Sequence, residues 1–333
     1  MSCEFSLIIP VYNIQDYIYK CLHSIEEQTY TDYEVIIIDD GSTDNSGAIC
    51  DQFSDRNKQF ITYHKENGGL SDARNYGIQK ANGKFLIFID GDDYVSNSML
   101  EEFHRVITEK PDIDVILEDG QFFDEEGKIS YDKRFNSSKF GIKNGEKALE
   151  YLLKGKSLWA AFGKCYNRNF WMNHHFQFMR GITSEDFELI YKVIYKAQKI
   201  TMKGGSSYYY RINRKGSIIE SFNIDDMINV FYIIDRWEEF FVNEKVNMII
   251  RFGMRRKFGD LVRFYILRQM PDLDGVQKQK FNDIIKKYIR YLKYGNNVWI
   301  YIVVKVKGID CLLSLYNFLI QRYRRKTYEN ISK

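Results

Sequence analysis

Short apolar runs and amphipathic segments alternate along the first hundred residues. The apolar runs have the length and composition of buried strands and cover residues 4–11, 33–38, 60–64 and 85–89. Between them, apolar residues recur at helical spacing over residues 17–28, and two further helical patterns end at Phe53 and near Ala81. Pro10 has no N–H to donate to a sheet ladder, so it is expected to end the first strand. This alternation predicts βαβ units and a mostly parallel central sheet, which is an α/β fold.

The pattern is less regular after residue 100 and becomes helical from about residue 225. Further strands are expected at residues 114–117, 120–123 and 208–211, with a turn at 124–127 and a polar, partly helical loop at 137–156. A helix is expected to run through Ile194, with Ser184 as its N-cap. We therefore expect an α/β domain over residues 1–222 and an α-helical C-terminal region over residues 223–333.

The composition is that of a globular protein that stays in the cytoplasm. Apolar residues make up 44% and charged residues 28% of the 333 residues. The five cysteines form no C-x-x-C pair, which favours reduced thiols. The sequence shows no export signal and no apolar run long enough to span a bilayer, so we expect a protein that is neither exported nor integral to the membrane.

The formal net charge of +3 hides a contrast between two parts of the chain. Residues 1–242 carry 28 Lys and Arg against 38 Asp and Glu, a net charge of −10, whereas residues 243–333 carry 20 against 7, a net charge of +13. Residues 295–326 combine large apolar side chains with a basic set: Lys305, Lys307, Arg322, Arg324, Arg325 and Lys326. This composition is typical of a helix that lies on an anionic membrane surface, and a core or dimer-forming helix with a basic tail is the alternative.

Acidic residues follow two of the predicted strands directly. Asp90, Asp92 and Asp93 come after the run at 85–89, and Asp39 and Asp40 follow the run at 33–38. Carboxylates this close repel one another unless a cation lies among them, and Mg²⁺ and Mn²⁺ prefer oxygen ligands. The carboxyl ends of strands are also where open α/β sheets bind ligands. We predict a cation site that holds a phosphate; the alternative is an acidic turn that caps the next helix.

A second acidic pair, Glu185 and Asp186, lies at the predicted start of a helix. The helix dipole favours carboxylates there, which is the purely structural interpretation. The functional interpretation is that Asp186 is a general base that faces the metal site across a cleft. A G-x-G-x-x-G motif and a Walker lysine motif are both absent, which argues against a dinucleotide oxidoreductase and a P-loop enzyme.

Five motifs in order resemble those of family 2 glycosyltransferases, in particular the bacterial enzymes that build capsule, exopolysaccharide or O-antigen repeats. They are LIIPVYN at 7–13, IIIDDGSTDNS at 36–46, ENGGLSDARNYGI at 66–78, FLIFIDGDDYV at 85–95 and SED at 184–186. The resemblance covers about residues 4–220 and implies the GT-A fold, a Rossmann-like α/β architecture. It also implies a nucleotide-sugar half at residues 1–100 and an acceptor half at residues 101–222.

The resemblance implies a role for each matching residue. It assigns the nucleotide-sugar contacts to Pro10, Tyr12, Asp40, Gly69, Ser71, Arg74, Asp90 and Gly91. Tyr12 would lie beside the base, Asp40 would accept a hydrogen bond from the uracil imide of a UDP-sugar, and Arg74 would order the acidic cleft. Asp92 would be the main protein ligand of Mn²⁺ or Mg²⁺. Asp186 would take the proton from an acceptor hydroxyl in a single displacement that inverts the anomeric centre.

The acceptor side is less defined by the motifs. Trp159, Glu185 and Arg211 are the candidates for acceptor contacts, and Arg180 stands where relatives often carry an acidic residue. The Q-x-x-R-W sequence of processive synthases is absent, so we expect addition of one sugar to a saccharide acceptor that is lipid-linked, at the inner face of the cell membrane. The sequence does not reveal the sugar, the linkage or whether the chain forms a homo-oligomer.

Two other functions stay open from the sequence. A nucleotidyltransferase shares the sheet and the carboxylate chemistry, but it would need a basic glycine-rich loop near the first strand, and LIIPVYN has none. The non-enzymatic alternative is a subunit that binds a nucleotide-sugar or a partner transferase without turnover. Intact Asp92 and Asp186 argue against it. No feature of the sequence points to a nucleic-acid partner.

Overall fold

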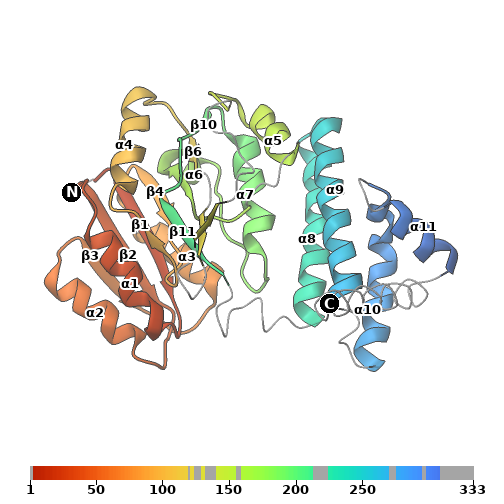
Figure 1. Cartoon of the computed structure of the whole chain (residues 1–333), viewed down its shortest axis with the longest axis horizontal. Helices are drawn as coiled ribbons and strands as arrows, with labels where there is room; N and C mark the ends of the chain where they lie inside the picture. The colour runs from red at the N-terminus through yellow and green to blue at the C-terminus, as the bar shows by residue number, and fades with distance from the viewer. Residues whose placement is uncertain are drawn as a thin grey trace, which may run out of the picture. The chain divides into compact units, whose positions relative to one another are not determined.

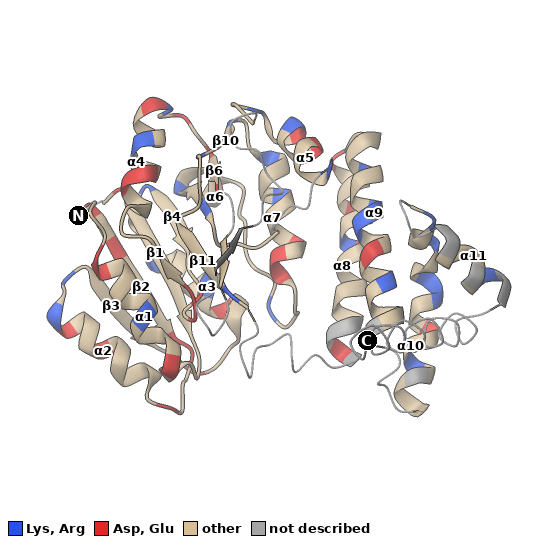
Figure 2. Ribbon diagram, in the orientation of Figure 1, with Lys and Arg blue, Asp and Glu red and all other residues tan. Residues whose placement is uncertain are grey.

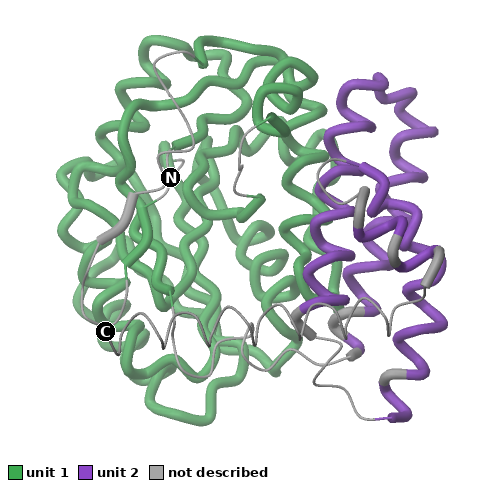
Figure 3. Tube along the Cα trace, turned by 45° about the vertical axis from the view of Figure 1, so that its right-hand side comes forward, with its two compact units in different colours: residues 1–221 green, residues 222–333 purple. Residues whose placement is uncertain are grey.

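The computed structural model describes residues 3–118, 121–123, 129–131, 140–154, 159–212, 224–269, 275–294 and 298–307. The chain divides into two compact units, Met1–Ser221 and Phe222–Lys333 (Figure 3). The division falls beside the boundary expected at residues 222 and 223.

A seven-stranded sheet forms the centre of the first unit (Figure 1). Its strands, in spatial order, are β10 (Ile200–Met202), β6 (Val115–Leu117), β9 (Lys164–Asn167), β4 (Phe85–Phe88), β1 (Phe5–Val11), β2 (Tyr33–Asp39) and β3 (Phe60–His64). All neighbouring pairs are parallel except those that β9 makes with β4 and β6. Every residue of β1 and β4 is buried. The predicted α/β fold with a mostly parallel sheet is confirmed.

Helices that alternate with these strands cover the sheet. They are α1 (Gln15–Glu26), α2 (Ser46–Arg56), α3 (Leu70–Lys80), α4 (Met99–Glu109), α5 (Gly145–Lys154), α6 (Arg168–Asn173) and α7 (Glu185–Lys196). The apolar stripe of α4 shows why they form: Leu100, Phe103 and Ile107, at helical spacing, are all buried. α3 packs directly on β1 and β2.

The sequence predicts that Pro10 ends the first strand, and this prediction is wrong. β1 continues to Val11, which pairs with Asp39, and Pro10 pairs in register with Ile38. The pairing of β1 with β4 stops at Ile8, because β4 ends there. The backbone N–H of Ile89, just after β4, donates to the carbonyl of Ile8. Backbone groups two positions apart in a strand face the same side, so the nitrogen of Pro10 also faces this side, where β4 has already ended. The missing N–H therefore interrupts no ladder.

Two strands and one helix were not expected in their observed form. β9 enters antiparallel between β4 and β6, and β10 adds the outer strand, yet both are too short for a periodic signal. The polar loop expected over residues 137–156 contains α5, whose Leu149, Leu152 and Leu153 are buried. α5 packs against α7 and is part of the core rather than a surface loop.

A second, four-stranded sheet lies beside the edge where the central strands end. Its order is β5 (Tyr94–Val95), β11 (Tyr208–Arg211), β7 (Gln121–Phe123) and β8 (Ile129–Tyr131). The strand expected at 208–211 is confirmed, and β11 joins β5 although more than a hundred residues separate them. The turn expected at 124–127 lies outside the described residues.

All elements that the structure describes in the second unit are helical. Its elements are α8 (Ile224–Asn243), α9 (Met248–Phe264), a π-helical turn (Tyr265–Gln269), α10 (Gly275–Tyr288), a 3₁₀ turn (Ile289–Lys293) and α11 (Val298–Lys307). Phe231, Trp237, Phe241 and Phe258 are buried, as their helical spacing predicted. Lys and Arg positions recur along α9 and α10 (Figure 2). Of the basic segment at 295–326, only α11 is described, and no described helix is long and apolar enough to cross a membrane.

Candidate active site

The three strands whose ends carry the predicted site lie side by side. β1 pairs in parallel with β2 on one side and with β4 on the other, so their carboxyl ends meet at one edge of the sheet (Figure 1). Tyr12 follows β1 and is 49% exposed. Asp40 follows β2 and is buried. Asp90 follows the end of β4 within two residues. The sheet topology thus gathers the first, second and fourth motifs.

Asp40 orders the glycine turn that precedes α3. Its Oδ1 accepts the backbone N–H of Gly68 at 3.0 Å and its Oδ2 accepts that of Gly69 at 2.7 Å. Lys65 donates to Asp40 Oδ1 and also pairs with Asp72 at 2.7 Å. Gly69 has a φ of +84°, a conformation that side chains rarely adopt. Asp40, which the resemblance assigns to the uracil of a UDP-sugar, therefore also holds the glycine turn that the resemblance places beside the nucleotide.

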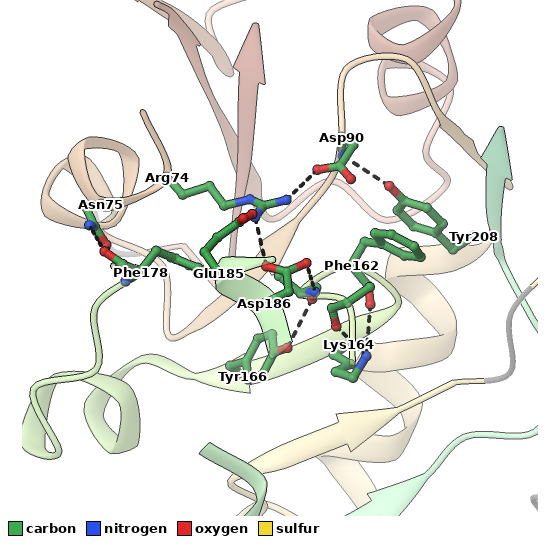
Figure 4. A network of polar contacts seen from close by, with 12 residues as sticks. Arg74, Asn75, Asp90, Phe162, Lys164, Tyr166, Phe178, Glu185, Asp186 and Tyr208 are labelled. Carbon is green, nitrogen blue, oxygen red and sulfur yellow. Dashed lines mark hydrogen bonds and ion pairs between the residues drawn. The ribbon is translucent and has the colours of Figure 1, made fainter. Parts of the chain in front are cut away.

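Arg74 joins the two acidic motifs. It lies on α3 with 1% of its surface exposed. Its Nη1 donates to Glu185 Oε1 at 2.7 Å and to Asp186 Oδ1 at 2.9 Å, and its Nη2 donates to Asp90 Oδ1 at 2.8 Å. Figure 4 shows the guanidinium between the carboxylates of Asp90 and Asp186. One buried side chain thus brings the end of β4 and the start of α7 into a single site.

The charges around Arg74 do not cancel, because one guanidinium meets three carboxylates. Burial raises the pKa of Glu185 to about 7, the charge of Asp186 adds to this, and Arg74 opposes it. Burial likewise raises the pKa of Asp186 against the effect of Arg74. Burial lowers the pKa of Arg74, but its carboxylate partners outweigh burial and raise it above its ordinary value. The excess of negative charge favours a bound proton or cation.

A short loop before β9 fixes the second carboxylate oxygen of Asp186. Its Oδ2 accepts the backbone N–H of Ala161 at 2.8 Å (Figure 4). Lys164 holds this loop, because its Nζ donates to the carbonyls of Ala160 at 2.6 Å and Phe162 at 3.2 Å. Burial lowers the pKa of Lys164 to about 8, while nearby carboxylates, Asp186 first, oppose this. Asp186 is thereby held on both sides.

The sequence predicts Ser184 as the N-cap of α7. Ser184 does precede α7, but its side chain does not cap the helix. Its backbone is left-handed, with φ 63° and ψ 33°, and its side chain makes no capping hydrogen bond. Glu185 and Asp186 then occupy the first turn of α7, as expected, where the helix dipole favours carboxylates. Local sequence rules predicted the start of this helix but not the geometry of its first residue.

The turn after β4 carries the candidate metal ligands. Asp90 is engaged by Arg74, Asp92 is half-buried and Asp93 is 1% exposed. Burial raises the pKa of Asp93 well above its ordinary value, and the charges of Asp92 and Asp90 add to this. In the part of the chain that the structure describes, no group of three or more His, Cys, Asp or Glu is arranged to hold a metal ion by itself.

The three candidate acceptor residues lie in different surroundings. The ring of Trp159 is 39% exposed and meets Phe187, in the first turn of α7, edge-on at 5.5 Å. Glu185 is bound to Arg74. Arg211 is on β11, where its Nε donates to the backbone carbonyl of Asp92 at 2.9 Å. Arg211 therefore lies at the candidate metal turn, whereas Trp159 lies beside the start of α7.

Arg180, which stands where relatives often carry an acidic residue, pairs with Asp72 at the start of α3. The distance between Arg180 Nη2 and Asp72 Oδ1 is 2.5 Å, and the Arg180 side chain is 66% exposed. His174 and His175 are both exposed, and the ring of His174 stacks on Phe176 at 5.3 Å.

Sequence reasoning missed several residues that the structure brings to the site. Lys164 is a lone cation in the apolar stretch WAAFGKCYN, and such a cation suggests burial with partners. Tyr208 lies in a run of three tyrosines, and the sequence does not show which of their hydroxyl groups reaches the site. The backbone N–H of Ala161 carries no sequence signal at all, because every residue except proline has one.

The chain matches the model of glycosyl transferase family 2 over residues 6–179. It is 31% identical over 242 residues to glycosyltransferase GlyG of Streptococcus pneumoniae, an alignment that covers 69% of this chain and 79% of GlyG. It is 33% identical over 221 residues to glycosyltransferase GlyA of the same organism, which covers 65% of this chain but only 31% of GlyA. The chain thus spans under a third of the length of this second relative.

Solved structures share the fold at low sequence identity. Residues 1–349 of S. aureus TarS, in complex with UDP-GlcNAc, superpose with a TM-score of 0.67 at 19% identity, covering 96% of this chain and 92% of that one. Mannosyltransferase PcManGT from Pyrobaculum calidifontis, in complex with GDP-Man and Mn²⁺, gives a TM-score of 0.54 at 12% identity, covering 99% and 88%. These likenesses establish a GT-A fold. The fold and the family match together lead to one conclusion: the chain belongs to glycosyl transferase family 2.

Proposed function

We propose that this protein is an inverting, metal-dependent glycosyltransferase that moves one sugar from a UDP-sugar to a hydroxyl of a saccharide acceptor. The observation that carries the proposal is the Arg74 network, which places the motif at the end of β4 and the acidic pair of α7 in one buried site. The family match and the UDP-GlcNAc complex of the structural relative TarS support the donor class.

Asp186 is the proposed general base. Its two carboxylate oxygens accept hydrogen bonds from Arg74 and from the N–H of Ala161, which orients the group. Each oxygen has a second acceptor site, so the acceptor hydroxyl can still donate to one of them. Burial raises the pKa of Asp186, which makes it a better proton acceptor than an exposed aspartate.

The reaction proposed for this site is a single displacement. The acceptor oxygen attacks the anomeric carbon as Asp186 takes its proton, a new C–O bond forms, and the bond to the diphosphate breaks with its electron pair on the departing UDP. Attack from the face opposite the leaving group inverts the configuration, so an α-linked donor gives a β-glycoside. Glu185, which shares Arg74, supports the charge balance of the base rather than replacing it.

The residues present fit a divalent cation that binds together with the nucleotide. Asp92 is half-buried at the end of β4, and Asp90 lies two residues before it. Mg²⁺ and similar cations are commonly held by one or two carboxylates plus substrate phosphates, so a complete protein cage is not required. Asp92 would hold the cation, Mn²⁺ or Mg²⁺, which acts as a Lewis acid toward the charge on the diphosphate. The structural relative PcManGT was solved with Mn²⁺.

We further assign nucleotide contacts to the residues around the glycine turn and the end of β1. These are Pro10, Tyr12, Asp40, Gly69, Ser71, Arg74, Asp90 and Gly91. Tyr12 is exposed enough to lie against a base, and the open space at Gly69 lets the backbone approach a ligand. Trp159 offers a partly exposed ring for stacking on an acceptor sugar.

The acceptor we propose is a lipid-linked saccharide of a cell-surface polysaccharide such as capsule or exopolysaccharide. The enzyme would meet it at the inner face of the cell membrane, with its basic C-terminal region on the anionic surface. The net charge of +13 over residues 243–333 supports this location. Relatives with matched segments are named as glycosyltransferases, which agrees with the reaction class.

Calorimetric titration of UDP tests the proposal most directly. We expect binding in Mn²⁺ that is lost in EDTA and strongly weakened in the Asp92→Asn variant. A panel of UDP-sugars, followed by donor hydrolysis, then identifies the sugar. Failure of UDP to bind under any condition would reject the donor class and direct the screen to dTDP- and GDP-sugars. Metal-dependent binding of donors without hydrolysis or transfer to any acceptor would favour a non-catalytic subunit.

A further inference from the structure

The turn that follows β4 is held by a strand from the far end of the unit. Residues 90–93 leave the central sheet and lead into β5, which pairs antiparallel with β11. The register places Tyr208 opposite Val95 and Tyr209 opposite Tyr94. The side chains and backbone of β11 therefore lie against the turn that carries Asp92.

Asp93 is the centre of this contact. It is 1% exposed, and its two carboxylate oxygens accept from two donors of β11: Oδ2 from the Tyr208 hydroxyl at 2.6 Å and Oδ1 from the backbone N–H of Arg211 at 2.7 Å. The Tyr208 hydroxyl in turn accepts the backbone N–H of Asp90 at 3.0 Å (Figure 4). Asp93 is almost fully buried, so a cation cannot reach its oxygens from solvent, and both oxygens face donors of β11; Asp93 is therefore a structural anchor rather than a metal ligand.

Arg211 completes the attachment at Asp92 itself. Its Nε donates to the Asp92 carbonyl at 2.9 Å. The guanidinium lies 4.7 Å from the ring centroid of Tyr17 and 4.5 Å from that of Phe123, and these two contacts restrict its position. The Tyr208 ring is likewise fixed, stacked on Phe162 at 4.6 Å. The backbone on both sides of the Asp92 side chain is thus tied to side chains that are themselves packed.

Gly91 closes the turn on its inner side. A Cβ at this position would meet Ile14 Cδ1 at 2.5 Å and the Pro10 carbonyl oxygen at 3.2 Å. The turn is therefore pressed against β1 and the start of α1 on one side and tied to β11 on the other. It has little freedom to redirect the Asp92 carboxylate.

We infer that Asp93, Tyr208 and Arg211 form a positioning clamp that aims the Asp92 carboxylate at a divalent cation bound with a nucleoside diphosphate. This rests on the proposed function. The physical reason is preorganisation: a carboxylate that is the main protein ligand of a cation binds it well only if that carboxylate is already oriented. Residues that orient a ligand typically change metal affinity 10- to 100-fold when they are replaced.

The test is the Tyr208→Phe variant, which removes one hydroxyl and keeps the ring stacked on Phe162. The matched control is Tyr210→Phe, because Tyr210 is on the same strand and also stacks on Phe162, at 4.9 Å, but is not part of the clamp. Mn²⁺ is titrated at fixed UDP by calorimetry, and UDP is titrated at saturating Mn²⁺. We expect Tyr208→Phe to weaken the apparent affinity for Mn²⁺ about tenfold or more. Its affinity for UDP at saturating Mn²⁺ should change by less than about threefold. The Tyr210→Phe variant should bind both like the wild type.

Each outcome bears on a different claim. A wild type that binds UDP equally with and without Mn²⁺ overturns the metal part of the proposed function and this inference with it. A wild type that needs Mn²⁺, beside a Tyr208→Phe variant with unchanged Mn²⁺ affinity, overturns the inference alone, even if the variant melts at a lower temperature. If Tyr208→Phe does not fold, Arg211→Met removes the donor to the Asp92 carbonyl and must show the same loss of Mn²⁺ affinity.

Discussion

At the scale of single residues, the protein concentrates negative charge around one arginine. Arg74 is buried and faces Asp90, Glu185 and Asp186, so each carboxylate senses the other two as well as the guanidinium. Glu185 and Asp186 are neighbours in sequence and share Arg74, but only Asp186 also receives the N–H of Ala161. The N–H of Ala161 fixes the direction of the Asp186 carboxylate, and this orientation supports the proposal that Asp186 is the base.

Replacing Asp186 by Asn should separate catalysis from donor binding. The amide keeps the size of the side chain but cannot take a proton, so transfer should fall by about 10² to 10⁴. UDP affinity in Mn²⁺ should stay within a few-fold of the wild type. Product formation with a UDP-sugar donor and calorimetry measure the two effects, and Glu185→Gln serves as the comparison, with transfer retained to a greater extent. Equal activity of Asp186→Asn and the wild type would remove the base assignment.

Glu185 should make stability depend on pH in a defined direction. Its pKa is raised to about 7 in the folded state by burial, so the folded protein binds this proton more tightly than the unfolded chain does. The stability contributed by the proton is present below the unfolded value of about 4.5 and is lost as the pH rises from there to about 7. Over this window the loss amounts to at most roughly 3–4 kcal/mol.

The Glu185→Gln variant tests this dependence, because glutamine does not titrate. Urea unfolding of both proteins at pH 5 and pH 8 gives the two free energies of unfolding. We expect the variant to gain stability relative to the wild type on going from pH 5 to pH 8. Two proteins whose stabilities change in parallel across this range would show that Glu185 keeps an ordinary pKa in the folded state.

At the scale of elements, the site depends on how closely α3 approaches the sheet. α3 carries Arg74 and packs on β1 and β2. The contact is made possible by Gly77, since a Cβ there would lie 2.5 Å from Ile8 Cγ2 in the middle of β1. Close packing of this helix, rather than helix propensity, sets the height of the Arg74 guanidinium above the strand ends.

Gly77→Ala should therefore destabilise the protein although alanine is the better helix former. Overpacking of this kind costs about 1–3 kcal/mol, and nearly all of this range lies above the gain of about 1 kcal/mol in helix propensity. Gln79→Ala on the same helix is the control, because Gln79 is exposed and its replacement should change stability by less than about 0.5 kcal/mol. Chemical unfolding measures both, and a Gly77→Ala protein at least as stable as the wild type would contradict the packing argument.

At the scale of the whole molecule, the two units differ in charge as well as in fold. The α/β unit carries the acidic site, whereas the chain beyond residue 242 is strongly basic. A basic region of this kind is attracted to anionic lipid and weakly to neutral lipid. The proposal of a lipid-linked acceptor predicts that this attraction is measurable with the complete chain.

Vesicle sedimentation tests the attraction without truncating the protein. We expect the chain to bind vesicles that contain anionic lipid, to release as salt rises from 0.05 to 0.5 M, and to bind neutral vesicles little. Changing four basic residues near the C-terminus, Arg322, Arg324, Arg325 and Lys326, to Gln should reduce binding, since each contributes about 1 kcal/mol near such a surface. Binding that is equal for the two lipid types and for the variant would reject an electrostatic membrane contact.

The sequence alone was sufficient for features that depend on neighbouring residues. Apolar runs predicted β1, β2 and β4, and the motifs that follow these runs were expected at their carboxyl ends, because strand length and alternation with helices are local properties. The helical pattern after residue 225 was confirmed wherever the chain is described. The exceptions at this level were small: Pro10 stays inside β1, and Ser184 precedes α7 in a left-handed conformation.

Only the tertiary structure decided how those motifs become one site. The antiparallel insertion of β9, the capture of Asp186 by the N–H of Ala161, and the attachment of Asp93 to β11 each join segments that lie far apart in the chain. Their hydrogen bonds depend on distances between strands and on burial, which no window of sequence contains. The motifs therefore predicted the chemistry, while the packing of α3, α7 and β11 around the end of β4 determined which carboxylates meet the same arginine.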